Sequence, residues 1–191
     1  MNNDLSEKPV MMIIAGPEGS GKSTLTDKSS VAGIYINADD IKQCRKCSDI
    51  EAKREEELIK ESLLSARKSF TFETSLSTEN DLILPEIAKN LGYVIESIFV
   101  LTCDALLNVK RIKSRVLKGG NDVIKDKTHK KFNKSLELLK RLAQISDICI
   151  VVDNTATPEV IYKKGYDDEE LYFSNDFWAE DYIKELTTTL Q

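Results

Sequence analysis

Residues suited to binding phosphate lie near the amino terminus of the chain. The segment from Gly16 to Ser23 reads GPEGSGKS and fits the P-loop pattern G-x-x-x-x-G-K-[ST]. Its glycines allow successive backbone N–H groups to point at phosphate oxygens, and the amino end of a following helix adds partial positive charge. An ordinary glycine turn is the alternative, but the apolar run before the motif and the helical stretch after it favour phosphate binding. The predicted ATP-binding residues are Gly16, Pro17, Glu18, Gly19, Ser20, Gly21, Lys22, Ser23 and Thr24, with Lys22 on the outer phosphates and Ser23 as a ligand of Mg²⁺.

Carboxylates follow two further apolar runs. Asp39 and Asp40 come after one run, and Glu73 and Thr74 end the other. The carboxyl ends of parallel strands meet at one edge of a sheet, so these side chains should lie near the P-loop. Asp39 could accept the proton of an acceptor hydroxyl or help to hold magnesium, whereas Asp40 could cap a helix or support the residues that contact the ligands. Glu73 and Thr74 could bind substrate hydroxyls, although hydroxyl residues here could equally cap the next helix.

The basic residues are concentrated in one part of an acidic chain. The net charge is −5, yet residues 108–142 contain twelve basic and three acidic residues, while residues 153–191 contain three basic and ten acidic ones. Arg111 and Arg115 are four residues apart, so they share a helix face and could clamp a transferring phosphoryl group, or simply form part of a solvated basic face. Only Phe132 interrupts the lysines, which disfavours a groove for single-stranded nucleic acid. A local anion site is the better interpretation.

The elements that must position these residues alternate along the chain. Apolar runs predict strands, and amphipathic stretches predict helices. Their alternation predicts an α/β fold with a mainly parallel sheet of about five strands covered by helices. This is the three-layer arrangement of P-loop kinases. The expected strands are Val10–Ala15, Ala32–Asn37, Ser69–Glu73, Tyr93–Leu101 and Asp147–Val152, and the expected helices begin near Lys22 or span Ser48–Lys68, Glu79–Asn90, Asp104–Lys118 and Val123–Ile145. A small edge appendage should follow, with strands at Glu159–Lys163 and Leu171–Ser174 and a helix at Asp176–Leu186.

The length of 191 residues suits a single domain, here 1–191, with a core of about 10–154, a helical lid-like region of about 108–142 and an appendage at 155–191. No signal peptide precedes the first strand, and no apolar stretch is long enough to cross a bilayer, which predicts a cytoplasmic protein without membrane association. Cys44 and Cys47 form a lone C-x-x-C with a single histidine, His129, elsewhere in the chain. These residues are too few to predict a closed zinc site.

Taken in order, the motifs resemble those of the zeta toxin family of P-loop kinases. The similar segments are Gly16–Ser23, Asn37–Ile41 (NADDI), Phe72–Ser77 (FETSLS), Arg111–Val116, Gly119-Gly120 with Asp122-Val123, and Val152–Asn154. The resemblance implies ATP-dependent phosphorylation of the sugar 3-hydroxyl of UDP-N-acetylglucosamine, with Mg²⁺ as the metal and an antitoxin protein as a partner. It also implies that Asp39 is the base, Glu73 a sugar ligand and Arg111 a transition-state clamp supported by Arg115.

Three positions depart from the family pattern. Asn121 stands where the family usually has a cation, and Lys130 and Lys131 stand where it favours arginine, whose planar fork lysine cannot reproduce. Two other functions therefore stay open at this stage. The chain could be a P-loop kinase for another phosphate-bearing acceptor, such as a nucleotide or a nucleic-acid end, or a non-catalytic ATP-binding module.

Overall fold

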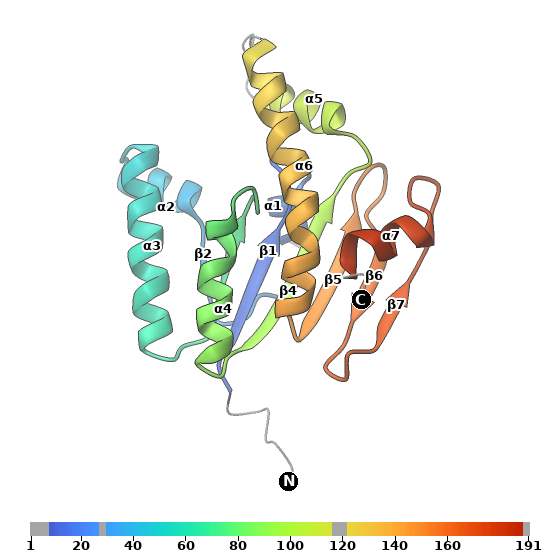
Figure 1. Cartoon of the computed structure of the whole chain (residues 1–191). Coiled ribbons are helices and arrows are strands. Elements are labelled where there is room, and N and C mark those ends of the chain that lie inside the picture. Colours follow the sequence, from blue (N-terminus) through green and yellow to red (C-terminus); the bar gives the residue numbers. More distant parts are fainter. Residues whose placement is uncertain (1–7, 27–29, 116–121, 189–191) are drawn as a thin grey trace.

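The computed structural model of the protein describes residues 8–26, 30–115 and 122–188, and for 115 and 122–126 only the backbone. The Gly119-Gly120 break and Asn121 therefore lie outside the described residues, as does the side chain of Arg115. The structure is shown in Figure 1.

Parallel strands form the centre of the sheet. The strand order is β2-β3-β1-β4-β5-β6-β7, and the first five of these are parallel. Strands β6 and β7 continue the sheet in the antiparallel sense. The strands span Val10–Ala15 (β1), Ile34–Ile36 (β2), Phe70–Thr74 (β3), Val94–Leu101 (β4), Ile148–Asp153 (β5), Glu159–Lys164 (β6) and Glu170–Tyr172 (β7). The predicted α/β fold with five parallel strands is confirmed, and the predicted appendage supplies the two antiparallel edge strands.

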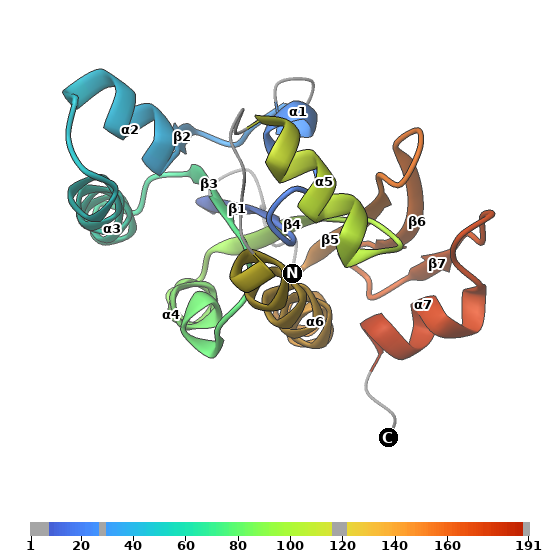
Figure 2. The same ribbon diagram turned by 90° about the horizontal axis from the view of Figure 1, so that it is seen from above.

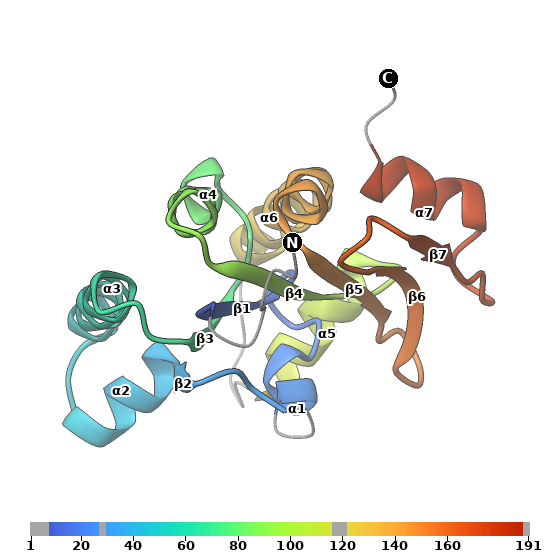
Figure 3. The ribbon, with the colours of Figure 1, turned by 90° about the horizontal axis from the view of Figure 1, so that it is seen from below.

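Helices cover both faces of this sheet. Figures 2 and 3 show α4, α6 and α7 on one face and α1 and α5 on the other, with α2 and α3 beside the β2 edge. The helices span Lys22–Thr26 (α1), Ala38–Arg45 (α2), Asp49–Ser65 (α3), Ile83–Asn90 (α4), Ala105–Arg115 (α5), Asp122–Ile145 (α6) and Glu180–Thr187 (α7), and a 3₁₀ helix, η2, spans Glu79–Leu82. Among the described residues, no helix is long and apolar enough to cross a membrane.

The core explains why the apolar runs become strands. Strand β1 pairs with β3 and β4 on its two sides and buries Met11, Ile13, Ile14 and Ala15 almost completely. A strand covered by helices on both faces has no solvent side, so its sequence is continuously apolar rather than alternating. Burial of this kind contributes roughly 25 cal/mol per Å² of apolar surface removed from water.

The sequence allows a helix cap at Asp40 but predicts no helical span for α2. Helix α2 buries none of its side chains, so it lacks the apolar periodicity by which a helix is recognised in a sequence. Its amino-terminal cap is Asn37, whose side-chain oxygen accepts a hydrogen bond from the backbone N–H of Asp39 at 2.8 Å. Of the two roles expected for Asp40, that of the cap is therefore wrong, because Asp39 and Asp40 both lie in the first helical turn.

Helix α3 begins as predicted and carries an unexpected polar stripe. Ser48 caps it in a capping box with Glu51. The four buried positions are spaced four residues apart and include two charged residues: Ala52, Glu56, Lys60 and Leu64. Leu58, an apolar residue of this helix, is 58% exposed. The inner face of α3 is therefore partly charged where it approaches the carboxyl ends of the strands.

Candidate active site

The P-loop connects the end of β1 to α1 and has the backbone that its glycines require. Gly16 has φ 138°, and a Cβ atom there would lie 2.0 Å from the carbonyl oxygen of Val100. Gly21 has φ 98°, and a Cβ atom there would lie 2.3 Å from the Asn154 side-chain amide. Side chains at these positions are therefore excluded both by backbone strain and by contact. Within this loop the Lys22 ammonium donates to the carbonyl oxygens of Gly16 at 2.7 Å and Pro17 at 3.2 Å.

Glu73 is the centre of a hydrogen-bond network next to the P-loop. Its Oε2 accepts a hydrogen bond from the Ser23 hydroxyl at 3.1 Å, and its Oε1 accepts from Thr26 at 2.9 Å and from the Tyr35 hydroxyl at 2.6 Å. Strand β3 lies between β1 and β2 in the sheet, and this position brings Glu73 between the P-loop helix and the end of β2. The carboxylate expected to bind substrate hydroxyls thus already binds three hydroxyls of the protein.

Tyr35 links this network to the start of α2. Its hydroxyl accepts a hydrogen bond from the side-chain amide of Asn37 at 2.9 Å while donating to Glu73. Burial raises the pKa of Tyr35 far above its ordinary value, and the hydrogen bond to Glu73 raises it further. Tyr35 therefore stays protonated and acts as a fixed donor. Because Asn37 also caps α2, the network fixes the first turn of the helix that carries Asp39.

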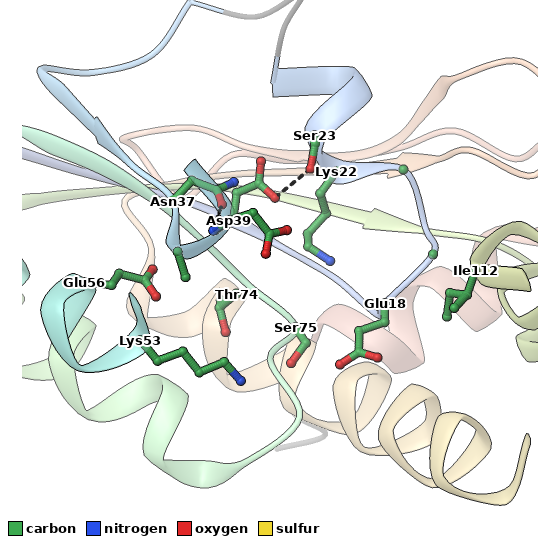
Figure 4. A pocket seen from close by; sticks show the side chains of 14 residues that line it. Glu18, Lys22, Ser23, Asn37, Asp39, Lys53, Glu56, Thr74, Ser75 and Ile112 are labelled. Atoms are coloured by element: carbon green, nitrogen blue, oxygen red, sulfur yellow. Dashed lines mark hydrogen bonds between the residues drawn. The ribbon is translucent and has the colours of Figure 1, made fainter. Parts of the chain in front are cut away.

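A cavity of about 380 Å³ opens beside these residues (Figure 4). The predicted residues Glu18, Gly19, Gly21, Lys22, Ser23, Asp39, Glu73 and Thr74 all line it, together with Asn37, Ala38, Lys53, Glu56, Ser75 and Ile112. Asp39 is exposed on the first turn of α2 and faces the same space as Lys22 and Ser23. Gly16, Pro17, Ser20 and Thr24 belong to the P-loop and the start of α1 without lining the cavity.

Arg111 lies behind the P-loop and does not line this cavity. Its Nη2 atom donates to the backbone carbonyl oxygens of Asn154 at 2.9 Å and Thr155 at 3.2 Å, and its Nη1 atom donates to that of Ser20 at 3.5 Å. The Asn154 side chain also donates to the carbonyl oxygen of Ser20 at 2.7 Å. In this arrangement Arg111 ties α5 to the P-loop and to the end of β5. Its role as a transition-state clamp stays a prediction.

Among the described residues, one ion pair joins the long basic helix α6 to the P-loop. The Lys131 ammonium lies 2.9 Å from a carboxylate oxygen of Glu18, and both side chains are half exposed. Lys131 therefore contacts the phosphate-binding loop directly, as a point charge where an arginine would offer a planar fork. For Lys130 the structure records only an exposed position on the same helix.

Several residues at the site were not predicted from the sequence. Thr26 and Tyr35 lie in the Glu73 network, and Lys53 and Glu56 bring α3 to the cavity. Burial raises the pKa of Glu56, although the nearby Lys60 opposes this shift. The sequence did carry one usable signal, since Glu56 and Lys60 occupy the buried four-residue spacing of α3 where apolar residues would normally stand.

The donor set at the P-loop fits a magnesium ion held mainly by phosphate oxygens. Magnesium binds oxygen ligands and usually takes only one or two from the protein beside a nucleotide. The Ser23 hydroxyl provides such an oxygen, and the Glu73 carboxylate accepts the hydrogen bond that this hydroxyl donates. Among the described residues, no group of three or more histidine, cysteine, aspartate or glutamate side chains could hold a metal ion without such a ligand.

Comparison with solved structures finds the same fold in other proteins. The chain is similar to a structure of the PezAT chromosomal toxin-antitoxin system of Streptococcus pneumoniae, with 17% identity, a TM-score of 0.59 and coverage of 95% of this chain and 79% of that one. It is also similar to the AvrRxo1-ORF1:-ORF2 complex with ATP, with 14% identity, a TM-score of 0.65 and coverage of 96% and 65%. At these identities the likeness shows the fold alone.

Sequence comparison identifies the family. No curated protein has a significant match to the chain. The zeta toxin family model, however, matches residues 2–167, which include the P-loop, Asp39, Glu73 and Arg111. This match spans most of the 191 residues and agrees with the fold of the two similar structures. The chain therefore belongs to the zeta toxin family.

Proposed function

We propose that the protein is an ATP-dependent kinase that transfers the γ-phosphoryl group to a sugar hydroxyl of UDP-N-acetylglucosamine. The observation that carries this proposal is the shared cavity of Lys22, Ser23 and Asp39, in which a phosphate-binding loop faces a free carboxylate. Family membership supports the P-loop kinase type of function, and the resemblance of the motifs to zeta toxins supplies the acceptor.

Each residue of the cavity has a distinct task in this proposal. Lys22 donates to two carbonyl oxygens of the P-loop, which holds its ammonium group at the phosphate-binding loop. On ATP binding Lys22 would exchange these partners for the outer phosphates. Asp39 accepts the proton of the attacking hydroxyl, for which an exposed carboxylate at the cavity wall is suited. If α5 moves on nucleotide binding, Arg111 and Arg115 would stabilise the transferring phosphoryl group. The side chain of Arg115 lies outside the described residues.

Magnesium, when bound, would neutralise charge that develops on the phosphate oxygens. Ser23 would contribute its hydroxyl, and Glu73 would orient that hydroxyl or accept a hydrogen bond from a coordinated water. Glu73 thus supports the phosphate side of the site more directly than the sugar. Thr74 and Ser75, which follow it and line the cavity, are then the neutral hydroxyls available to the acceptor.

The cellular setting is proposed on similarity. The structure similar to this chain from Streptococcus pneumoniae is described as a chromosomal toxin-antitoxin system, which supports an antitoxin protein as a partner here. A cytoplasmic location follows from the substrate, since both ATP and UDP-N-acetylglucosamine are made there. If the protein is a toxin, its expression should slow growth, and Lys22→Ala should abolish that effect.

A transfer assay tests the reaction. Purified protein is incubated with ATP, magnesium and UDP-N-acetylglucosamine, and the sugar nucleotide is followed by mass for an added phosphoryl group. Asp39→Asn should lower transfer by about 10²- to 10⁴-fold, the range for loss of a general base, with ATP binding kept. Asp40→Asn is the matched control, because Asp40 lies in the same helical turn but does not line the cavity. Equal transfer by the wild type and Asp39→Asn would overturn the role of Asp39, and absence of product from the wild type would overturn this acceptor.

A further inference from the structure

A lysine on α3 has no role in the reaction proposed above, although it lines the same cavity. Lys53 and Lys22 are the two cationic residues among the described residues that line the cavity, and Lys22 belongs to the P-loop. Figure 4 shows the Lys53 side chain extending from α3 into the cavity on the side of Thr74 and Ser75. Its ammonium group therefore lies on the acceptor side of the site, away from α1.

Two further hollows open next to this cavity, and Lys53 lines both of them. One of about 380 Å³ continues between α3 and η2, past Glu57, Lys60 and Asn80. The other, of about 390 Å³, lies between the P-loop and the starts of α2 and α3, beside Glu18 and Asp49. Lys53 is the one described residue that lines all three spaces. An acceptor larger than a monosaccharide would thus pass this ammonium group whichever hollow it occupied.

The carboxylates three or four residues from Lys53 are paired with other lysines. On a helix, carboxylates three or four residues away neutralise a lysine. Here Asp49 pairs with Lys42 at 2.7 Å, and Glu57 pairs with Lys60 at 2.7 Å. Glu56 also lies nearer to Lys60, at 3.9 Å. Within the described part of the chain, Lys53 forms no ion pair within 4 Å. Its charge favours the ionised carboxylates of Asp49 and Glu56 without such a contact, so its ammonium group can still bind a ligand.

The remaining charges around the cavity are negative. Glu18, Asp39, Glu56 and Glu73 line it. Among the described residues, two of these carboxylates pair with a cation from outside the cavity, Glu18 with Lys131 at 2.9 Å and Glu56 with Lys60 at 3.9 Å. Such a lining repels an anionic acceptor unless a cation compensates for it locally. Lys22 is committed to the P-loop, so Lys53 is the other cation that the described lining of the cavity offers to the second substrate.

We infer that Lys53 binds an anionic phosphate group of the acceptor, and so makes this site specific for phosphate-bearing acceptors over neutral alcohols. The inference rests on the proposed kinase function. It adds a specificity-determining residue and a requirement on the substrate class. Lysine suits this task, because a point charge on a flexible stem can follow a phosphate that differs in position between ligands.

Binding measurements test the inference independently of transfer. The ATP site is saturated with a non-hydrolysable ATP analogue and magnesium, and the dissociation constants of UDP-N-acetylglucosamine, UDP and inorganic pyrophosphate are measured by calorimetry. Loss of one charge-assisted hydrogen bond should weaken phosphate-bearing probes by about 10- to 100-fold in Lys53→Met, with recovery in Lys53→Arg. The matched control is Arg54→Met, which removes the same charge from the neighbouring position of α3, where the side chain lines a separate apolar hollow beside Leu58.

The outcomes separate this inference from the reaction. Phosphate-bearing probes that bind Lys53→Met as tightly as wild type overturn the role of Lys53, even if UDP-N-acetylglucosamine is phosphorylated. Failure of all three probes to bind the wild type also overturns it. Binding of UDP or pyrophosphate that depends on Lys53, without transfer to UDP-N-acetylglucosamine, supports the inference and overturns only the proposed acceptor.

Discussion

The Ser23 hydroxyl donates a hydrogen bond to Glu73 at an Oγ–Oε2 distance of 3.1 Å. This contact joins the last residue of the P-loop pattern to the end of the neighbouring strand β3. It places a carboxylate directly behind the hydroxyl that the motif assigns to magnesium. Glu73 is itself fixed by Thr26 and Tyr35 through its other oxygen, so its orientation does not depend on the presence of a ligand.

Glu73→Gln should therefore impair the use of magnesium more than the binding of the acceptor. An amide keeps the shape but removes the charge, and changes just outside the metal ligands typically cost about 10- to 100-fold in metal affinity or activity. The measurement is the magnesium concentration that gives half-maximal transfer, which should rise by this factor. Tyr35→Phe, which removes one donor but keeps the carboxylate, should have a smaller effect. An unchanged magnesium dependence, together with a higher KM for the sugar nucleotide, would instead make Glu73 a substrate ligand.

Arg111→Lys should lower the free energy of unfolding more than it lowers kcat. The guanidinium donates to the carbonyl oxygens of Ser20, Asn154 and Thr155. The ammonium group of lysine is a single point charge without the planar fork of donors, so it cannot reproduce this geometry. Leaving part-buried carbonyls unpaired costs about 1–3 kcal/mol, which should appear in the free energy of unfolding measured in urea. Lys113→Arg on the same helix, an exposed position, is the control. An Arg111→Lys variant of unchanged stability but lower kcat would favour the clamp role.

The sequence predicted the sheet better than it predicted the site. Strands such as β1 and β4 are covered on both faces, so their continuous apolar runs identify them directly. The P-loop was equally clear, since its spacing is dictated by phosphate geometry. The span of helix α2 could not be predicted, because none of its side chains is buried and a helix without an apolar stripe leaves no periodic pattern in the sequence.

The missed site residues depend on tertiary contacts that no local pattern records. Lys53 looks like any surface lysine in the sequence, because Asp49 and Glu57 stand at pairing distance along the helix. The structure shows that Lys42 of the neighbouring helix α2 pairs with Asp49 and that Lys60 pairs with Glu57. The same holds for Tyr35, which meets Glu73 although 38 residues separate them in the chain. The division into core, lid-like region and appendage stays a prediction.

Glu56→Gln should change how stability depends on pH. Burial raises the pKa of Glu56 above 4.5, so the folded state holds this proton more tightly than the unfolded state does. The stabilisation from the protonated form is fully present below the unfolded pKa and is lost as the pH rises through the folded pKa. Glutamine is neutral throughout, so the variant should gain free energy of unfolding relative to wild type between pH 4.5 and 8.

Glu61→Gln, at an exposed position of α3, is the control. A pH-independent difference would show that Glu56 is already ionised and compensated by Lys60.

Thiol labelling provides a check on the core that needs no substrate. Cys149 lies in β5 and is completely buried, and this burial raises its pKa to about 11. Cys44 and Cys103 are exposed and Cys47 is half-buried. The thiolate is the reactive form and a free cysteine has a pKa of about 8.5, so Cys149 should react with a thiol reagent at pH 8 more than about 100-fold slower than the exposed thiols.

Three thiols should therefore label quickly, and the fourth only at the rate at which the protein opens. Cys149→Ser should remove the slow phase and leave the fast one unchanged. Four equally fast thiols in the native protein would show that β5 is not held in the sheet between β4 and β6.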